Sequence, residues 1–201
     1  IERYASPTSE MVTELISYQD SEIALPKVAA EALLAGITVD TKNFFYQTGT
    51  RTFEAAAYLK RKGADSIVIK ELFKDDFELM RYRSEILVSA KHLRPDIMIA
   101  RFPHDIEGST LIASQAADDL LGIRGIKASF VLTLAEKRVH ISARSLGDIS
   151  VQLIMEKIGG GGHMTAAATQ MDTTLDEAQK QLEEAIETYL KEAVSYTHLR
   201  A

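Results

Sequence analysis

The sequence contains no cysteine, which excludes disulfide bonds, zinc-thiolate sites and cysteine nucleophiles. Any bound metal must therefore use oxygen or imidazole ligands. No stretch approaches the roughly 20 apolar residues that a membrane-spanning helix needs, and no signal-peptide pattern opens the chain. The chain has 23 Lys and Arg residues and 29 Asp and Glu residues, so its formal net charge is -6. This balance disfavours capture of duplex nucleic acid, so a small nucleotide in a local basic pocket fits better than a long polymer.

The remaining composition is that of an ordinary folded protein. The chain has 201 residues, of which 46% are hydrophobic and 26% charged, enough to form a buried core in one or two domains. It begins at Ile1 without an initiator methionine. We therefore expect a fragment of a longer protein.

Helical and strand-like segments alternate in the first part of the chain. Helices are predicted from Ser6 and Pro7 onward, from about Pro26 to Gly36, and from Thr50 or Thr52 to Lys62. Two short runs rich in β-branched residues predict buried strands. One is 37–39, which leads to Asp40, and the other is 66–69, after the third helix. The alternation is typical of an α/β layer.

A different pattern follows a charged helical stretch that begins near Lys74 and ends before Pro95. A strand is predicted at 97–102, a helix at 109–121 and a hairpin across 127–144. In the second hairpin strand, His140, Ser142 and Arg144 share one face, which we expect to meet solvent or a ligand. Thr174 and Glu177 predict the start of a last helix. Residues 195–201 continue neither its apolar spacing nor its acidic character, so we expect a tail that is frayed or foreign to the fold.

Four consecutive glycines, Gly159 to Gly162, precede His163. Each ordered glycine costs roughly 0.5–1 kcal/mol more than alanine in regular structure. Gly159 is explained as the cap of a helix predicted over 150–158. For Gly160, Gly161 and Gly162 the sequence leaves two explanations, which are a phosphate-binding turn completed by the His163 ring and a flexible loop with a solvent-facing histidine.

Three further side chains are candidates for chemistry. Asp40 follows a predicted strand, where carboxylates hold divalent cations, although an aspartate there also caps turns. Arg144 and, less clearly, Arg51 can grip a phosphate through the planar guanidinium. A solvated or ion-paired arginine is the alternative for Arg144.

Five segments of the chain resemble DHH-family phosphoesterases, most closely the cyclic-di-AMP phosphodiesterases of the GdpP type. They occur in the family's order and read YASPTSEMVTEL (4–15), LAGITVDTK (34–42), TGTRTFEAA (48–56), SARSLG (142–147) and GGGH (160–163). The resemblance covers roughly residues 1 to 190. It implies an α/β protein in which the C-terminal part of a parallel α/β DHH domain (1–73) and a linker helix (74–95) precede a smaller DHH-associated domain with a mixed sheet (96–194).

The resemblance also implies the chemistry. Family enzymes hold two manganese ions, with magnesium as an alternative, and a metal-activated water attacks the phosphodiester. Asp40 matches the family's last metal-binding aspartate, the segment from Gly160 through Gly161 and Gly162 to His163 matches the substrate-binding motif, and Arg144 and Arg51 lie in matching segments. The implied substrate is the small cyclic dinucleotide cyclic di-AMP, which is hydrolysed to linear pApA.

One departure from the family pattern limits what this chain does alone. The Asp-His-His tripeptide is absent, so the other metal ligands would lie before Ile1 and we expect the isolated chain to be inactive. The family implies a cytoplasmic location, membrane attachment only through N-terminal helices that this sequence lacks, and allows a homodimer. The alternatives are an oligoribonuclease or bisphosphate-nucleotide phosphatase of the same superfamily, and a non-catalytic nucleotide- or RNA-binding module.

Overall fold

The computed structural model describes residues 8–19, 24–46, 48–74 and 76–198. Its contacts divide the chain into two compact units, residues 1–75 and 76–201. Each unit is described by itself. The predicted helix start at Ser6 and Pro7 lies outside the described residues.

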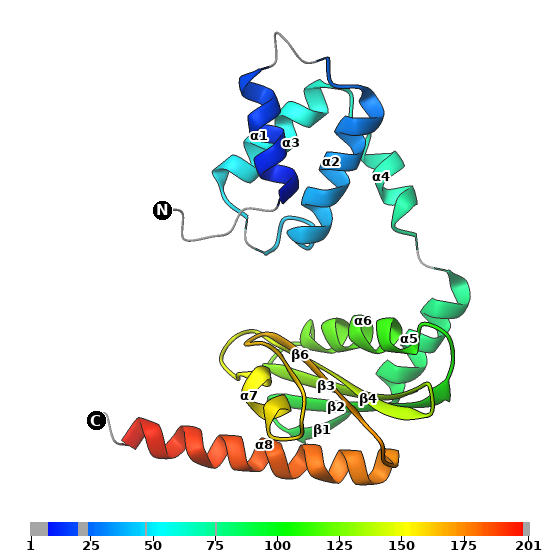
Figure 1. Cartoon of the computed structure of the whole chain (residues 1–201), viewed down its shortest axis with the longest axis vertical. Helices are drawn as coiled ribbons and strands as arrows, with labels where there is room; N and C mark the ends of the chain where they lie inside the picture. The colour runs from blue at the N-terminus through cyan, green and yellow to red at the C-terminus, as the bar shows by residue number, and fades with distance from the viewer. Residues whose placement is uncertain (1–7, 20–23, 47, 75, 199–201) are drawn as a thin grey trace. The chain divides into compact units, whose positions relative to one another are not determined.

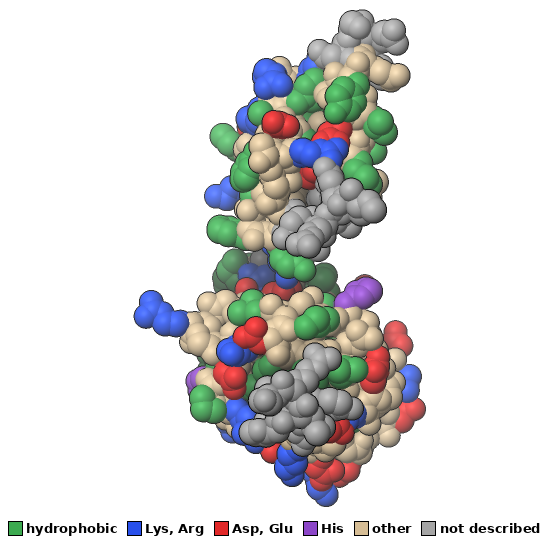
Figure 2. All heavy atoms as spheres, turned by 90° about the vertical axis from the view of Figure 1, so that its left-hand side faces the viewer, with side chains coloured by type: hydrophobic (Ala, Val, Ile, Leu, Met, Phe, Trp, Pro, Cys, Tyr) green, Lys and Arg blue, Asp and Glu red, His purple; other side chains and the backbone are tan. Residues whose placement is uncertain are grey.

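The described part of the first unit is built from four helices. They are α1 (Thr8–Tyr18), α2 (Lys27–Asp40), α3 (Thr50–Arg61) and α4 (Ser66–Leu72), shown in Figure 1. Ala30, Leu34 and Ile37 of α2 are buried at helical spacing against Leu59 of α3 and Ile69 of α4. This core is small, and apolar side chains remain on the surface of the unit, where Figure 2 shows several of them.

The strand predicted at 37–39 is wrong, because α2 continues to Asp40. Gly36 does not end the helix. A Cβ at Gly36 would lie 2.1 Å from the Oγ of Ser9 and 3.0 Å from its Cβ, so the glycine allows α1 to approach α2. Helical spacing then carries Ile37 into the core, and this burial outweighs the strand preference of Ile37, Thr38 and Val39.

The strand predicted at 66–69 is also wrong, because these residues form α4. The Asp65 side chain caps the helix by accepting a hydrogen bond from the backbone N–H of Ile67 at 2.8 Å. Only Ile69 is buried, whereas Ile67 and Val68 are exposed. In the described residues of the first unit the expected parallel sheet is therefore replaced by helices.

The second unit is a six-stranded mixed sheet with helices on both faces (Figure 1). The strands are β1 (Lys91–Arg94), β2 (Ile97–Asp105), β3 (Ala128–Ala135), β4 (Arg138–Ser145), β5 (Gly161–His163) and β6 (Ala166–Met171). Their order in the sheet is β1-β2-β3-β4-β6-β5, and only β2 and β3 run parallel. The α/β fold class with a mixed sheet is confirmed.

Two apolar layers cover the sheet. On one face, α7 (Val151–Glu156) and α8 (Leu175–His198) pack over Phe130, Leu132 and Ile141. On the other face, α5 (Phe77–Ser89) and α6 (Ser109–Leu121) pack over Met98, Phe102 and Val131. Residues that alternate along one strand therefore contact different helices.

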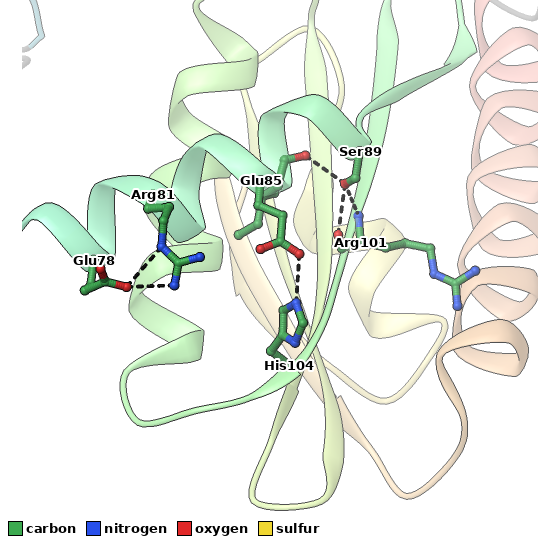
Figure 3. Close-up of polar contacts among 7 residues, drawn as sticks. Glu78, Arg81, Glu85, Ser89, Arg101 and His104 are labelled. Carbon is green, nitrogen blue, oxygen red and sulfur yellow. Dashed lines mark hydrogen bonds and ion pairs between the residues drawn. The ribbon is translucent and has the colours of Figure 1, made fainter.

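Polar contacts attach α5 to β2, as Figure 3 shows. The Ser89 hydroxyl donates to the carbonyl of Arg101 at 2.9 Å and accepts from the backbone N–H of Arg101 at 3.0 Å. The ring Nε2 of His104 lies 2.7 Å from a carboxylate oxygen of Glu85. The Ser89 contacts give the backbone of β2 polar partners at Arg101, past the residues that pair with β1.

Candidate functional site

One face of β4 carries polar side chains toward α6. Ser142 lies opposite Val131 of β3, and Val131 belongs to the layer that packs against α5 and α6. Because side chains two residues apart point to the same face of a strand, His140 and Arg144 share this side with Ser142. The residues between them, Ile141 and Ala143, are buried in the opposite layer. The predicted polar face of this strand is confirmed, and it lines a groove under α6.

The groove has a volume of about 510 Å³. Its walls come from the first turns of α6, the polar face of β4 and the strand pair β5–β6. The lining residues are Thr110, Leu111, Ser114, His140, Ser142, Arg144, Gly161, Gly162, Ala166, Ala167 and Ala168. The groove therefore combines one cationic side chain with hydroxyls, an imidazole and bare backbone, which are groups that can surround an anionic ligand.

Two of the four glycines are required by the close approach of β5 to β6. A Cβ at Gly160 would lie 2.4 Å from the carbonyl oxygen of Ala168. At Gly162, where φ is 148°, a Cβ would lie 2.5 Å from the carbonyl oxygen of Ala166. Gly159, with φ of 78°, follows α7 as expected for a helix-terminating glycine.

Gly161 is different, because a Cβ there would meet nothing within 4 Å. It lines the groove and lies opposite Ala168 of β6. Packing thus explains Gly160 and Gly162, whereas at Gly161 the space on the groove side is open to a ligand.

Arg144 is held in a fixed orientation by α6. Its Nε lies 3.4 Å from a carboxylate oxygen of Asp118, and its Nη2 contacts the hydroxyl of Ser114. Its Nη1 donates to the backbone carbonyl of the preceding residue, Ala143, at 3.0 Å. The side chain is only 19% exposed. A half-buried guanidinium with a defined orientation loses little side-chain entropy when it binds an anion.

His163 lies in the same row across the sheet as Arg144. Arg144 is paired with Ala166 of β6, and Ala166 is paired with His163 of β5. Directly opposite residues of antiparallel strands project to the same face. The His163 side chain is exposed, so its ring is accessible at the edge of the sheet that borders the groove.

His140 also lines the groove, although the sequence assigned it no role beyond its place on the polar face of the strand. Its Nδ1 is buried and has no hydrogen-bond partner among the described residues. Burial, together with the positive charge of Arg144, lowers the pKa of the His140 imidazole below its ordinary value. The alternation of apolar and polar residues along 139–144 predicted that His140 shares a face with Ser142 and Arg144. What the sequence did not show was that α6 would cover that face.

Asp40 and Arg51 lie in the first unit. Asp40 is the last residue of α2, so the expected strand end is wrong, and its side chain is exposed. The next turn is left-handed, with positive φ at Lys42, Asn43 and Phe44, and three such non-glycine residues in succession are a strained arrangement. The Thr41 hydroxyl accepts from the Phe44 N–H at 3.0 Å.

The Arg51 guanidinium forms an ion pair with Glu14 of α1. Burial and the neighbouring carboxylates Glu10 and Glu54 raise the pKa of Glu14. Arg51 lines a cleft between α1 and α3 in which two carboxylates, Glu14 and Glu54, face two guanidinium groups, its own and that of Arg61. It lines no part of the groove in the second unit.

The described residues do not form a metal centre. Across 8–19, 24–46, 48–74 and 76–198, no group of three or more His, Asp or Glu side chains is arranged to hold a metal ion. A single carboxylate such as Asp40 does not provide the several oxygen ligands that manganese or magnesium takes. The donors present therefore do not fit a two-metal site.

None of the helices within the described ranges is both long and apolar enough to cross a bilayer.

Comparison with known proteins places these features in a family context. Residues 96–192 match the family model described as the DHHA1 domain. The chain is 50% identical over 193 residues to a protein of Listeria monocytogenes named cyclic-di-AMP phosphodiesterase PdeA, and 45% identical over 193 residues to one of Geobacillus thermodenitrificans named cyclic-di-AMP phosphodiesterase GdpP. Each match covers 95% of this chain and 29% of the relative, so the chain spans less than a third of their length.

A solved structure is similar over both units. The crystal structure of an exopolyphosphatase-related protein from Bacteroides fragilis superposes with a TM-score of 0.82 at 26% sequence identity. The match covers 92% of this chain and 57% of that one.

Proposed function

Because the chain belongs to the DHH phosphoesterase family and carries its DHHA1 domain at residues 96–192, we propose that it is part of a phosphodiesterase that hydrolyses cyclic di-AMP to linear pApA. Two relatives that share 45–50% of its residues are named cyclic-di-AMP phosphodiesterases. In this proposal, residues 1–73 are the end of the catalytic DHH domain and 96–194 belong to the substrate-binding domain. The expected linker helix (74–95) and tail (195–201) are corrected by the structure, because α5 and β1 pack within the second unit and α8 continues to His198. Residues 76–94 and 195–198 are therefore assigned to the substrate-binding domain as well.

The groove under α6 supports the proposal most directly. Its cationic group, Arg144, is oriented by Asp118 and Ser114. The open backbone at Gly161 and the exposed ring of His163 lie on the adjoining strand. We assign these groups, together with Gly160 and Gly162, to binding of a phosphate of the substrate. Gly160 and Gly162 act indirectly, because they let β5 lie close enough to β6 to border the groove.

Metal binding is assigned to Asp40 in combination with residues outside this sequence. The described residues contain no complete metal site, so this chain alone is expected to be inactive. In the intact enzyme, two manganese ions, or magnesium in their place, would supply an activated water and neutralise phosphoryl charge. Arg51 would contribute positive charge in the first unit if its pair with Glu14 opens for substrate.

The remaining assignments follow from the family. The ligand is a small cyclic dinucleotide and not duplex nucleic acid, in accord with the net charge of -6. This part of the protein is assigned to the cytoplasm, with any membrane attachment through segments outside the sequence. A homodimer is compatible with the proposal.

Titration of cyclic di-AMP into the 201-residue chain, followed by calorimetry, tests the proposal. We expect binding, and we expect Arg144→Ala to weaken it at least tenfold, since a charge-assisted hydrogen bond contributes about 1.5–3 kcal/mol. Arg138→Ala is the matched control, because Arg138 is on the same strand but pairs with Asp172 outside the groove. Absence of binding contradicts the proposal. Tighter binding of a linear dinucleotide than of cyclic di-AMP favours the oligoribonuclease alternative.

A further inference from the structure

The two ends of the groove differ in chemistry. At one end, Arg144 contacts Ser114 and Asp118 in the middle of α6. At the other end lies His140, close to where α6 begins. The Ser109 hydroxyl at the start of α6 donates to the carbonyl of Leu134 at 2.7 Å, and Leu134 is paired with Val139, the neighbour of His140.

His140 and Arg144 are four positions apart along β4. At about 3.3 Å per residue this is about 13 Å of strand. A ligand that reaches from one to the other must carry an organic part several bonds long, as a nucleoside does.

The space between the two ends suits a flat ring. Ala166 and Ala168 of β6 are small, and Ser142 is the residue of β4 between the two ends. Leu111 of α6 also lines the groove and is 57% exposed. Its side chain offers an apolar surface against which a nucleobase can bury area.

A polar group is already present where the ring would end. The imidazole of His140 lines this end of the groove, and because its Nδ1 is buried, a ligand in the groove reaches the ring through Nε2. A neutral imidazole offers one donor and one acceptor. This matches the edge of a nucleobase, which carries both, better than it matches a phosphate, which only accepts.

We propose that His140 recognises the nucleobase of a nucleotide whose phosphate is bound at Arg144, through a hydrogen bond to its Nε2. The inference rests on the proposed function, because it takes the groove to be the nucleotide site. Burial and the nearby Arg144 charge lower the pKa of His140, which keeps its ring neutral at physiological pH and favours a base over a second phosphate. His140 is thereby a specificity-determining residue of the site.

Two probes that differ only in the base test the inference. The 201-residue chain is titrated with adenosine 5′-monophosphate and with ribose 5-phosphate, and each dissociation constant is measured by NMR. His140→Leu introduces an apolar side chain of similar size and removes both ring nitrogens. We expect it to weaken adenosine 5′-monophosphate about fivefold, as the loss of one neutral hydrogen bond of about 1 kcal/mol implies. Binding of ribose 5-phosphate should not change.

His140→Gln places an amide near the position of Nε2 and should restore much of the loss, while Arg144→Ala should weaken both probes. Equal effects of His140→Leu on the two probes, or none on either, overturn the role of His140 and leave the proposed function intact, provided that the unsubstituted chain binds both. If the unsubstituted chain binds neither probe nor cyclic di-AMP, the inference and the proposed function both fail. Circular dichroism of each variant checks that the fold is retained.

Discussion

Gly162 of β5 lies so close to Ala167 of β6 that a Cβ on the glycine would be 2.6 Å from the Ala167 Cα. The backbone at Gly162 also has a φ of 148°, a conformation that residues with a side chain rarely adopt. The glycine run is therefore partly a packing requirement, and only part of it is open to a ligand.

This contact predicts that the glycines of the run differ in their tolerance to alanine. Gly162→Ala should lower the free energy of unfolding by about 2 kcal/mol or more, because the new methyl group overlaps β6 and the backbone is strained. Gly161→Ala should change it by less than about 1 kcal/mol, since a Cβ there meets nothing. Urea unfolding of the two variants measures the difference. Equal losses would refute the packing explanation.

Acidification should destabilise the chain through His140. The folded state lowers the pKa of this imidazole, so near pH 6 the unfolded chain binds more protons than the folded chain. Stability therefore rises with pH and decreases as the pH falls through the unfolded value of about 6.5. His140→Leu should flatten the dependence between about pH 7 and pH 5.5. Urea unfolding at several pH values measures it, and an unchanged slope in the variant would exclude His140 as the source.

The first unit should open more readily than the second. Its buried core contains few residues, and large apolar side chains such as Phe45 and Leu72 are 91% and 66% exposed. The sheet of the second unit is instead covered by an apolar layer on each face. Hydrogen exchange followed by mass spectrometry should show faster exchange in α1 and α4 than in β3 and β4. Slower exchange in α1 and α4 would contradict this expectation.

Manganese should neither stabilise this chain nor make it active. The described residues offer Asp40 but no group of three potential ligands, so binding at one carboxylate should be too weak to raise the melting temperature at micromolar manganese. For the unsubstituted chain and for Asp40→Ala alike, the thermal unfolding curves recorded with and without manganese should coincide. Manganese-dependent hydrolysis of cyclic di-AMP by the purified chain would disprove the assignment of most metal ligands to other residues.

Sequence patterns predicted most of the second unit because its elements have clear local signals. The helix expected from Lys74 to just before Pro95 is wrong at its end, because α5 stops at Ser89 and Lys91–Arg94 form β1 against β2. The helix ending at Gly122, the hairpin across 127–144 and the last helix after Thr174 are all present. The Thr174 hydroxyl accepts from the Glu177 backbone N–H, as the capping pattern predicted.

The two strand predictions in the first unit were wrong because local signals there disagreed with tertiary packing. Local β-branched runs at 37–39 and 66–69 favoured strands, whereas tertiary burial of Ile37 and Ile69 and the Asp65 cap fixed helices. Gly36 was interpreted as a helix end because its contact with Ser9 cannot be seen from local spacing.

The sequence predicted only part of the candidate site. Motifs identified Arg144 and the glycine run, and alternation placed His140 and Ser142 on the face of Arg144. The wall formed by Thr110, Leu111 and Ser114 depends on how α6 crosses the sheet. That crossing is set by packing of the apolar face of α6 over β2 and β3 and leaves no signal in the groove residues themselves.

Mapping cyclic di-AMP on the chain by NMR tests the central claim most directly. If the groove under α6 is the nucleotide site, the backbone amide signals of Gly161, Gly162 and Ser142 should shift on titration, and those of Lys157 and Thr188, which line a separate groove beside α8, should not. Shifts confined to α7 and α8 or to the first unit, or no shifts at all, would contradict the account.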